Sequence, residues 1–210
     1  MNAFTLKLIA CVSMLIDHIG DILFPGERYL RHIGRLAFPI YAFLLTEGFF
    51  HSRNLKRYAM RLFGFALISE LPFDLAFYGE LSFKHQNVYF TLFLGLVLLV
   101  LLKEDSNPVR ELCYIGLICL IAQEIHCDYR YPGILMILFF AYYREIPFME
   151  ALSISICNMH FKSTIQRTGI LALFPVFLYN GKRGPDIKYA FYLYYPMHLL
   201  ALYFVKTRYF

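Results

Sequence analysis

The sequence predicts an all-α protein, a polytopic transmembrane bundle of eight or nine helices. The first observation is composition, because 59% of the 210 residues are hydrophobic and only 17% are charged, whereas soluble domains contain about 45–50% apolar and about 25% charged residues. The second is distribution, since apolar segments with short polar loops between them recur along the whole chain. About 20 largely apolar residues suffice to cross a bilayer. We therefore expect a single membrane domain over residues 1–210.

Nine apolar segments follow one another along the chain. We expect the first to be a retained membrane helix, because it has neither a basic start nor a small-residue cleavage site. The segments 131–143, 147–161 and 168–180 are short, and in the eight-helix alternative two of them are re-entrant or merged. The nine segments lie near 4–24, 33–50, 57–78, 87–102, 109–125, 131–143, 147–161, 168–180 and 189–206.

Two prolines interrupt this pattern. Pro72 stands between Glu70 and Asp74 in the segment 57–78 and is expected to break that helix, because proline has no N–H to donate. Pro196 is expected to kink the last helix or to start a half-helix there, a common device at binding sites inside membranes. The stretch YNGKRG at 179–184 is expected to be a glycine-bearing turn.

The distribution of basic residues predicts the orientation. The stretch HSRNLKR at 51–57 has four cationic residues and no acidic one, so we assign it and the N-terminus to the cytoplasm of a bacterial-type cell, and 26–32 to the outside. With nine helices, 180–188 lies inside as the rule expects, whereas the basic stretch 161–167 lies outside against it. The same rule explains the net charge of +5 without nucleic-acid binding. The five cysteines have no metal-like spacing, and no metal is expected.

Ionisable residues within the apolar segments predict a polar interior cavity. An ionised side chain at the bilayer centre is unfavourable by at least about 2.5–3.5 kcal/mol, so such residues usually face the interior of a bundle. Asp17 and Asp21 are four residues apart, as are Glu70 and Asp74, so each pair lies on one helix face. The residues concerned are Asp17, His18, Asp21, Arg35, Glu47, Arg61, Glu70, Asp74 and His198.

Purely structural interpretations remain open for these residues. Arg35 and Glu47 could form an internal ion pair. Glu70 and Asp74 could pair with Arg57 and Arg61, and HQN at 85–87 could cap and anchor the following helix. Asp17 and His18 are neighbours in a helix and point about 100° apart, so we expect each to find its partner on another helix.

Five blocks of the chain resemble the TraX family. They are MNAFTLKLIA with MLIDHIG, then IGRLAFPIYAFLLTEGFFHSRN, RLFGFALISELPFDLAFYG, HQNVYFTL and FYLYYPMHLL, and they extend from residue 1 to residue 200. TraX proteins are polytopic membrane proteins, and the best known is associated with acetylation of the pilin N-terminus. The position of His18 and the YYPMH element are also distantly similar to the transmembrane acyltransferase superfamily. The resemblance therefore implies an acyltransferase that uses acetyl-CoA as its donor.

The resemblance also implies roles for individual residues. Moving an acetyl group needs a base, donors to a developing oxyanion, and cations for the phosphates of the donor. His18 would be the base, with Asp17 beside it and His198 as the second candidate. Asn87, Gln86 or Arg35 would stabilise the oxyanion. The donor site would consist of Arg53, Lys56, Arg57 and Arg61, and the polar cavity would include Glu47, Glu70, Asp74, His85, Gln86 and Tyr195.

Two other functions remain open at this point. Buried carboxylates and histidines also form proton relays, so a small ion-coupled transporter is the alternative. A non-catalytic membrane scaffold is the third possibility, although it would not need so many internal charges. The expected partners are the lipid bilayer and an acyl acceptor, which could be a protein N-terminus, a glycan or a lipid headgroup.

Overall fold

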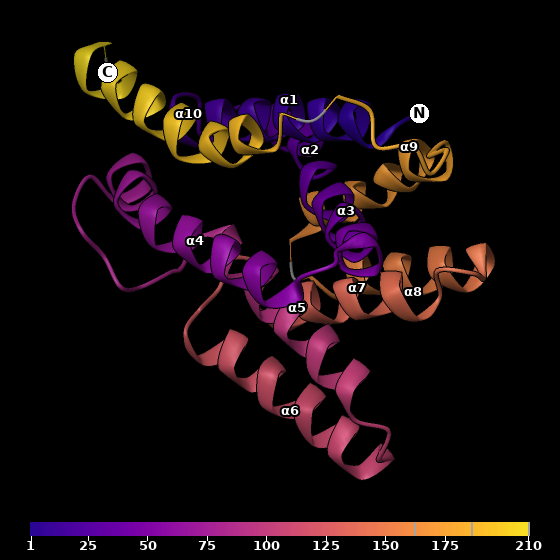
Figure 1. The fold of residues 1–210 in the computed structure, drawn as a ribbon. Coiled ribbons are helices and arrows are strands. Elements are labelled where there is room, and N and C mark those ends of the chain that lie inside the picture. Colours follow the sequence, from indigo (N-terminus) through magenta and orange to yellow (C-terminus); the bar gives the residue numbers. More distant parts are fainter. Residues whose placement is uncertain (162, 186, 210) are drawn as a thin grey trace.

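The computed structural model describes residues 1–161, 163–185 and 187–209, and these form helices joined by short loops (Figure 1). Within those ranges there is no extended strand, only an isolated bridge between Gln86 and Cys127. The all-helical prediction is therefore confirmed. The elements are α1 (Ala3–Ile22), α2 (Arg28–Gly34), α3 (Ala37–His51), α4 (Leu55–Tyr78), α5 (Val88–Glu104), α6 (Pro108–Glu124), α7 (Arg130–Tyr142), α8 (Pro147–His160), the 3-10 helix η1 (Thr164–Ala172), α9 (Leu173–Phe177) and α10 (Lys188–Tyr209).

Most predicted segments correspond to one helix each, but two differ. The expected outer loop 26–32 contains α2, which packs against α1 because Arg31 forms ion pairs with two aspartates of that helix. The expected helix 168–180 is replaced by η1 and the short α9. Gly169 in η1 lies so close to the Asn158 side chain that it leaves no room for a Cβ atom.

The two interior prolines do not interrupt their helices. α4 continues through Pro72 to Tyr78, so the predicted break is wrong. Likewise α10 continues through Pro196, and no half-helix starts there. The backbone hydrogen bonds that proline removes are compensated by packing, because α4 lies against both α5 and α10. The predicted turn near Asn180 is present, with Gly181 and Gly184 both at φ of 73°.

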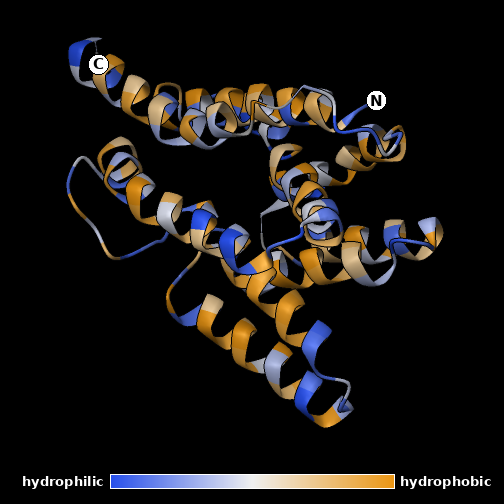
Figure 2. Cartoon of the chain, in the orientation of Figure 1, coloured by the Kyte–Doolittle hydropathy of each residue, from blue (hydrophilic) through white to orange (hydrophobic). Residues whose placement is uncertain are grey.

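Hydrophobic residues cover most of the helices, whereas hydrophilic residues gather in loops and at several helix ends (Figure 2). By length and composition, two helical stretches of the described chain are suited to crossing a membrane, Ala3–Ile22 and Arg28–His51. This finding is compatible with a membrane protein. α4 is long enough at 24 residues, but it carries Lys56, Arg57, Arg61 and two acidic residues. The nine-span arrangement stays a prediction.

Three helices bring distant parts of the sequence together around α1. α2 packs along its C-terminal half, and α10 runs beside it from the other end of the chain (Figure 1). α10 in turn packs against α4. The core around α1, to which α3 also contributes, includes the fully buried side chains of Leu6, Ile40 and Leu199. As a result, the polar residues near the end of α1 face side chains from α2, α4 and α10.

Candidate active site

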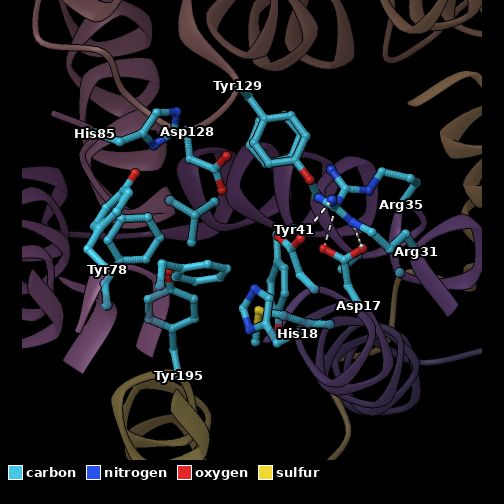
Figure 3. Close-up of a pocket in the computed structure, with 18 residues that line it drawn as sticks. Asp17, His18, Arg31, Arg35, Tyr41, Tyr78, His85, Asp128, Tyr129 and Tyr195 are labelled. Carbon is cyan, nitrogen blue, oxygen red and sulfur yellow. Dashed lines mark hydrogen bonds and ion pairs between the residues drawn. The ribbon is translucent and has the colours of Figure 1, made fainter. Parts of the chain in front are cut away.

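A cavity of about 270 Å³ lies at the C-terminal end of α1 (Figure 3). We call it the His18 cavity. Its walls come from the last turns of α1 and α4, from α2 and the start of α3, from the segments that precede α5 and α7, and from α10. The polar residues that line it are Asp17, His18, Asp21, Arg31, Arg35, Tyr41, Tyr78, His85, Asp128, Tyr129 and Tyr195.

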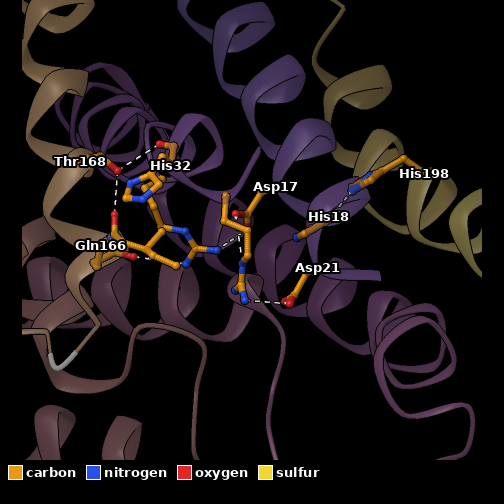
Figure 4. Close-up of polar contacts among 10 residues, drawn as sticks. Asp17, His18, Asp21, His32, Gln166, Thr168 and His198 are labelled. Carbon is orange, nitrogen blue, oxygen red and sulfur yellow. Dashed lines mark hydrogen bonds and ion pairs between the residues drawn. The ribbon is translucent and has the colours of Figure 1, made fainter. Parts of the chain in front are cut away.

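Two arginines connect α2 to the acidic face of α1 (Figure 4). Arg35 forms a short ion pair with Asp17. Arg31 bonds Asp21 at 2.8 Å, and its Nε atom lies 3.8 Å from the second carboxylate oxygen of Asp17. Both carboxylates on this face of α1 are therefore neutralised by cations of one neighbouring helix.

Arg35 is held on its other side by the η1 segment. Its Nη1 atom donates to the side-chain oxygen of Gln166 at 3.3 Å, and Gln166 donates to Asn158 at 3.4 Å. The Nε atom of Arg35 is buried and has no hydrogen-bond partner in the described ranges. The guanidinium is thus fixed in place at the wall of the cavity.

Gly34 explains how α2 approaches α1 so closely. A Cβ atom at this position would overlap the side chain of Asp17. The missing side chain therefore permits the contact between Asp17 and Arg35.

His18 contacts His198 on α10, and the hydrogen bonds of this pair determine which ring nitrogens carry protons. His198 Nδ1 lies 2.8 Å from the carbonyl oxygen of Tyr194, which can only accept, so this nitrogen carries the proton. In a neutral ring the other nitrogen, Nε2, is then an acceptor. It lies 2.7 Å from His18 Nδ1, which must donate to it. The lone pair of His18 consequently resides on Nε2, and His18 lines the cavity whereas His198 does not.

Aromatic rings surround this histidine. The edge-on rings of Phe77 and Tyr195 lie 5.5 Å and 6.1 Å from the ring of His18, measured between centroids. On the opposite wall, Phe38 and Tyr129 stack with centroids 3.7 Å apart. Polar interactions are stronger in a partly buried cavity of this kind than in water.

Asp128 is a lining residue that the sequence did not identify. It lies between α6 and α7, and its carboxylate extends into the cavity from the opposite side of the view to His18 (Figure 3). Burial raises the pKa of this carboxyl to about 6, although Arg35 acts in the opposite direction. Nearby, burial lowers the pKa of His85. Asp128 belongs to a short polar loop, where an isolated aspartate is ordinary. Its place in the cavity is therefore visible only in the folded structure.

A second cavity, of about 500 Å³, lies at the N-terminal end of α1. We call it the basic cavity, because Lys7, Arg57, Arg61 and Arg183 line it. Arg61 lies 5.4 Å from the ring centroids of both Tyr58 and Tyr192, and its buried Nε atom has no hydrogen-bond partner in the described chain. Tyr41 lines both cavities, so the two adjoin at this side chain.

The structure brings together part of the predicted site. Asp17, His18, Arg35, His85 and Tyr195 line the His18 cavity, with His198 directly behind His18. Of the predicted donor residues, Arg57 and Arg61 line the basic cavity, whereas Arg53 and Lys56 are exposed and line neither cavity.

The remaining predicted residues have structural partners elsewhere. Glu47 lies at the basic cavity and bonds Arg144 at 2.8 Å, so the suggested pairing with Arg35 is wrong. The pairing of Glu70 and Asp74 with Arg57 and Arg61 is wrong too. Glu70 accepts a short hydrogen bond from Asn87. Asp74 accepts a hydrogen bond of 2.9 Å from the backbone N–H of Ser82.

Asn87 and Gln86 line neither cavity. The Asn87 side chain caps α5 through the N–H of Tyr89, and it also donates to the carbonyl of Ala66. Gln86 donates weakly to the carbonyl of Phe83, and its backbone bonds the segment around Asp128. The capping interpretation of HQN is therefore confirmed for Asn87.

Comparisons with known proteins give matches that extend over almost the whole chain. The family described as “TraX protein” matches residues 3–206. A protein of Dichelobacter nodosus named “Probable fimbrial assembly protein FimC, serogroup H1” is 34% identical over 96% of this chain and 94% of its own. “Uncharacterized protein RP591” of Rickettsia prowazekii (strain Madrid E) is 42% identical over 45 residues, 21% of this chain and 18% of its own. No solved structure matches.

Proposed function

The chain belongs to the TraX family, and from this membership and the His18 cavity we propose that it is an integral membrane acyltransferase. It transfers an acetyl group from acetyl-CoA to an amine or hydroxyl acceptor. The observation that carries the proposal is the hydrogen-bond chain from the Tyr194 carbonyl through His198 to His18. This chain leaves the His18 Nε2 lone pair available to a cavity that could hold an acceptor.

In the proposed reaction His18 acts as the general base. Nε2 removes a proton from the acceptor while its nitrogen or oxygen forms a bond to the thioester carbonyl carbon. The carbon–sulfur bond then breaks, and the proton passes to the departing thiolate. The carbonyl oxygen acquires negative charge in the transition state, and the guanidinium of Arg35, which lines the cavity, would stabilise that charge. Asp17 keeps Arg35 in position through their ion pair.

The basic cavity is the proposed donor site. Arg57, Arg61 and Lys7 offer positive charge to the phosphates of coenzyme A. Because the basic cavity adjoins the His18 cavity at Tyr41, the thioester end of a donor bound there would be directed toward His18.

The two cavities lie at opposite ends of α1, which fits a protein that crosses the bacterial inner membrane. Part of the cation-rich stretch 51–57, including His51 and Arg57, lines the basic cavity, so this cavity would face the cytoplasm together with the N-terminus. The His18 cavity would then face the outside. The relative from Dichelobacter nodosus is named a fimbrial assembly protein, which makes a fimbrial subunit the first acceptor to test.

The test is acetyl transfer from radiolabelled acetyl-CoA, with purified protein in membranes and candidate acceptors. His18→Ala should still bind acetyl-CoA, yet lose about 10²–10⁴-fold of the transfer rate, the usual contribution of a general base. His160→Ala is the control, because His160 is exposed at the end of α8. Full activity of His18→Ala would overturn the base assignment.

The same histidine pair could also serve a proton relay in an ion-coupled transporter. That function predicts no acetyl transfer by the wild type, and a proton-dependent uptake that His18→Ala abolishes. Measuring both activities on the same membranes separates the two functions.

A further inference from the structure

We propose that Asp128 holds the acceptor in the His18 cavity and selects an acceptor that carries a positive charge, such as a primary ammonium group. The inference rests on the proposed function, because it concerns the second substrate of the same site. It starts from the one carboxylate of this cavity that has no cation of its own among the described residues.

The backbone of Asp128 is fixed on both sides. Its N–H donates to the carbonyl of Gln86 at 2.8 Å, and its own carbonyl accepts from the hydroxyl of Thr91 at 2.8 Å. The flanking residues His126, Tyr129 and Arg130 have positive φ angles of 54°, 66° and 44°, a region that side chains other than glycine rarely adopt. The fold therefore fixes the backbone position from which this carboxylate extends into the cavity.

The side chain of Asp128 is left without a partner. In the described chain it makes neither a hydrogen bond nor an ion pair within 4.0 Å, although it lines the cavity. Each of the two other carboxylates of the cavity has an arginine as its ion-pair partner, since Asp17 pairs with Arg35 and Asp21 pairs with Arg31. A half-buried carboxylate in such a place gains most from a ligand that brings both a charge and N–H donors.

The charge balance of the cavity agrees with a cationic ligand. Two arginines face three aspartates, which leaves one negative charge when the histidines are neutral. The groups that face Asp128 from the surrounding elements are Asp17, Asp21, Arg31, Arg35, His18, His85, Tyr78, Tyr129 and Tyr195.

A bound ammonium group fits the chemistry of the base. His18 Nε2 removes one proton from the ammonium, and the resulting amine forms the nitrogen–carbon bond as the carbon–sulfur bond of acetyl-CoA breaks. The nitrogen then loses a second proton, and the departing thiolate takes up one of the two protons, so the products are the amide, coenzyme A and one released proton. Asp128 is a binding residue in this scheme and takes no proton.

The experiment compares two peptides that differ in one atom position. One begins with alanine and has a free amine, and in the other a lactyl group replaces the alanine, so that a hydroxyl replaces the amine. Asp128→Asn should raise the KM and the dissociation constant of the amine peptide about 10- to 100-fold, the usual effect of losing a charge-assisted hydrogen bond. The lactyl peptide should be affected little, and the dissociation constant of acetyl-CoA should not change.

Asp105→Asn is the matched control. Asp105 follows α5, pairs with Arg110 at 3.1 Å and lines neither cavity. Asp128→Glu, which retains the charge, should keep the preference for the amine peptide. In the wild type, affinity for the amine peptide should fall as the pH is lowered from about 7.5 to about 5, because Asp128 becomes protonated. The affinity for the lactyl peptide should change much less. This measurement does not depend on whether a variant folds.

Equal losses with both peptides in Asp128→Asn would overturn the assignment, as would unchanged affinity for the amine peptide or wild-type affinity independent of pH. Peptide binding is measured separately from transfer. A wild type that binds the amine peptide through Asp128 but transfers no acetyl group to any acceptor would overturn the acyltransferase function and leave the binding role supported. A wild type that acetylates only the lactyl peptide would overturn the role of Asp128 alone.

Discussion

His18 donates a hydrogen bond from Nδ1 to Nε2 of His198 across a distance of 2.7 Å, so its base is oriented by a second imidazole. In the more familiar arrangement a carboxylate fulfils this role and also stabilises the imidazolium by its charge. Here the neighbouring carboxylate, Asp17, is engaged by Arg35 instead. Two different residues therefore serve two tasks: His198 orients His18, and Asp17 holds Arg35 in position.

The first prediction concerns His198. His198→Phe retains a ring of similar size but has no acceptor, so His18 could rotate or change tautomer. Outer partners that orient a histidine are worth about 10- to 100-fold in activity, and we expect a loss of that size in kcat with acetyl-CoA binding unchanged. His198→Gln, whose side-chain oxygen can accept, should recover part of the rate. If the two variants were equally impaired, His198 would have only a packing role.

The sequence predicted the helices well because most of them are long apolar runs between polar loops. It failed at α2, a seven-residue helix that is polar apart from three residues. That helix depends on contacts between Arg31 and two aspartates of α1, which local sequence cannot reveal. The prediction at Pro72 failed for the opposite reason, since tertiary packing outweighed the local tendency of proline to break a helix.

The second prediction concerns Gly34. A methyl group here would overlap Asp17, so Gly34→Ala should separate α2 from α1 and disturb the ion pair of Asp17 with Arg35. Overpacking of this kind typically destabilises a protein by about 1–3 kcal/mol. We expect a lower midpoint of thermal unfolding by circular dichroism, together with a reduced rate of acetyl transfer.

Gly64→Ala is the matched control for this change. Gly64 lies within α4, and a Cβ atom there would meet nothing within 4 Å. Because alanine favours a helix over glycine by about 1 kcal/mol, this variant should have an unchanged or higher midpoint. A Gly34→Ala protein as stable as Gly64→Ala would contradict the close approach of the two helices.

The site was only partly predictable, and the reason differs among its residues. Asp17, His18, Arg35 and His198 stood out because charges are unexpected in apolar helices. Asp128 did not, since its importance comes from a backbone contact with Gln86, 42 positions earlier in the chain by residue number. Glu47 and Glu70 stood out equally, yet they bond Arg144 and Asn87 outside the His18 cavity. An unusual charge indicates that a partner exists, but it does not say whether that partner is a substrate.

The last prediction compares two pairs of basic residues, all within nine positions of the chain, in the binding of acetyl-CoA. Arg57 and Arg61 line the basic cavity, whereas Arg53 and Lys56 do not, although Arg57 is exposed as they are. Replacing Arg57 and Arg61 by Gln should raise the dissociation constant of acetyl-CoA about 10- to 100-fold, since the half-buried Arg61 would contribute one charged contact of about 1.5–3 kcal/mol and the exposed Arg57 would add less. Replacing Arg53 and Lys56 by Gln removes the same formal charge but should raise the dissociation constant much less. That small increase over the wild type should vanish at high salt, because exposed charges are screened. Titration of purified protein with acetyl-CoA measures both. Equal weakening by the two double variants would mean that the loop attracts the donor only by its net charge, and no weakening by the first would exclude the basic cavity as the donor site.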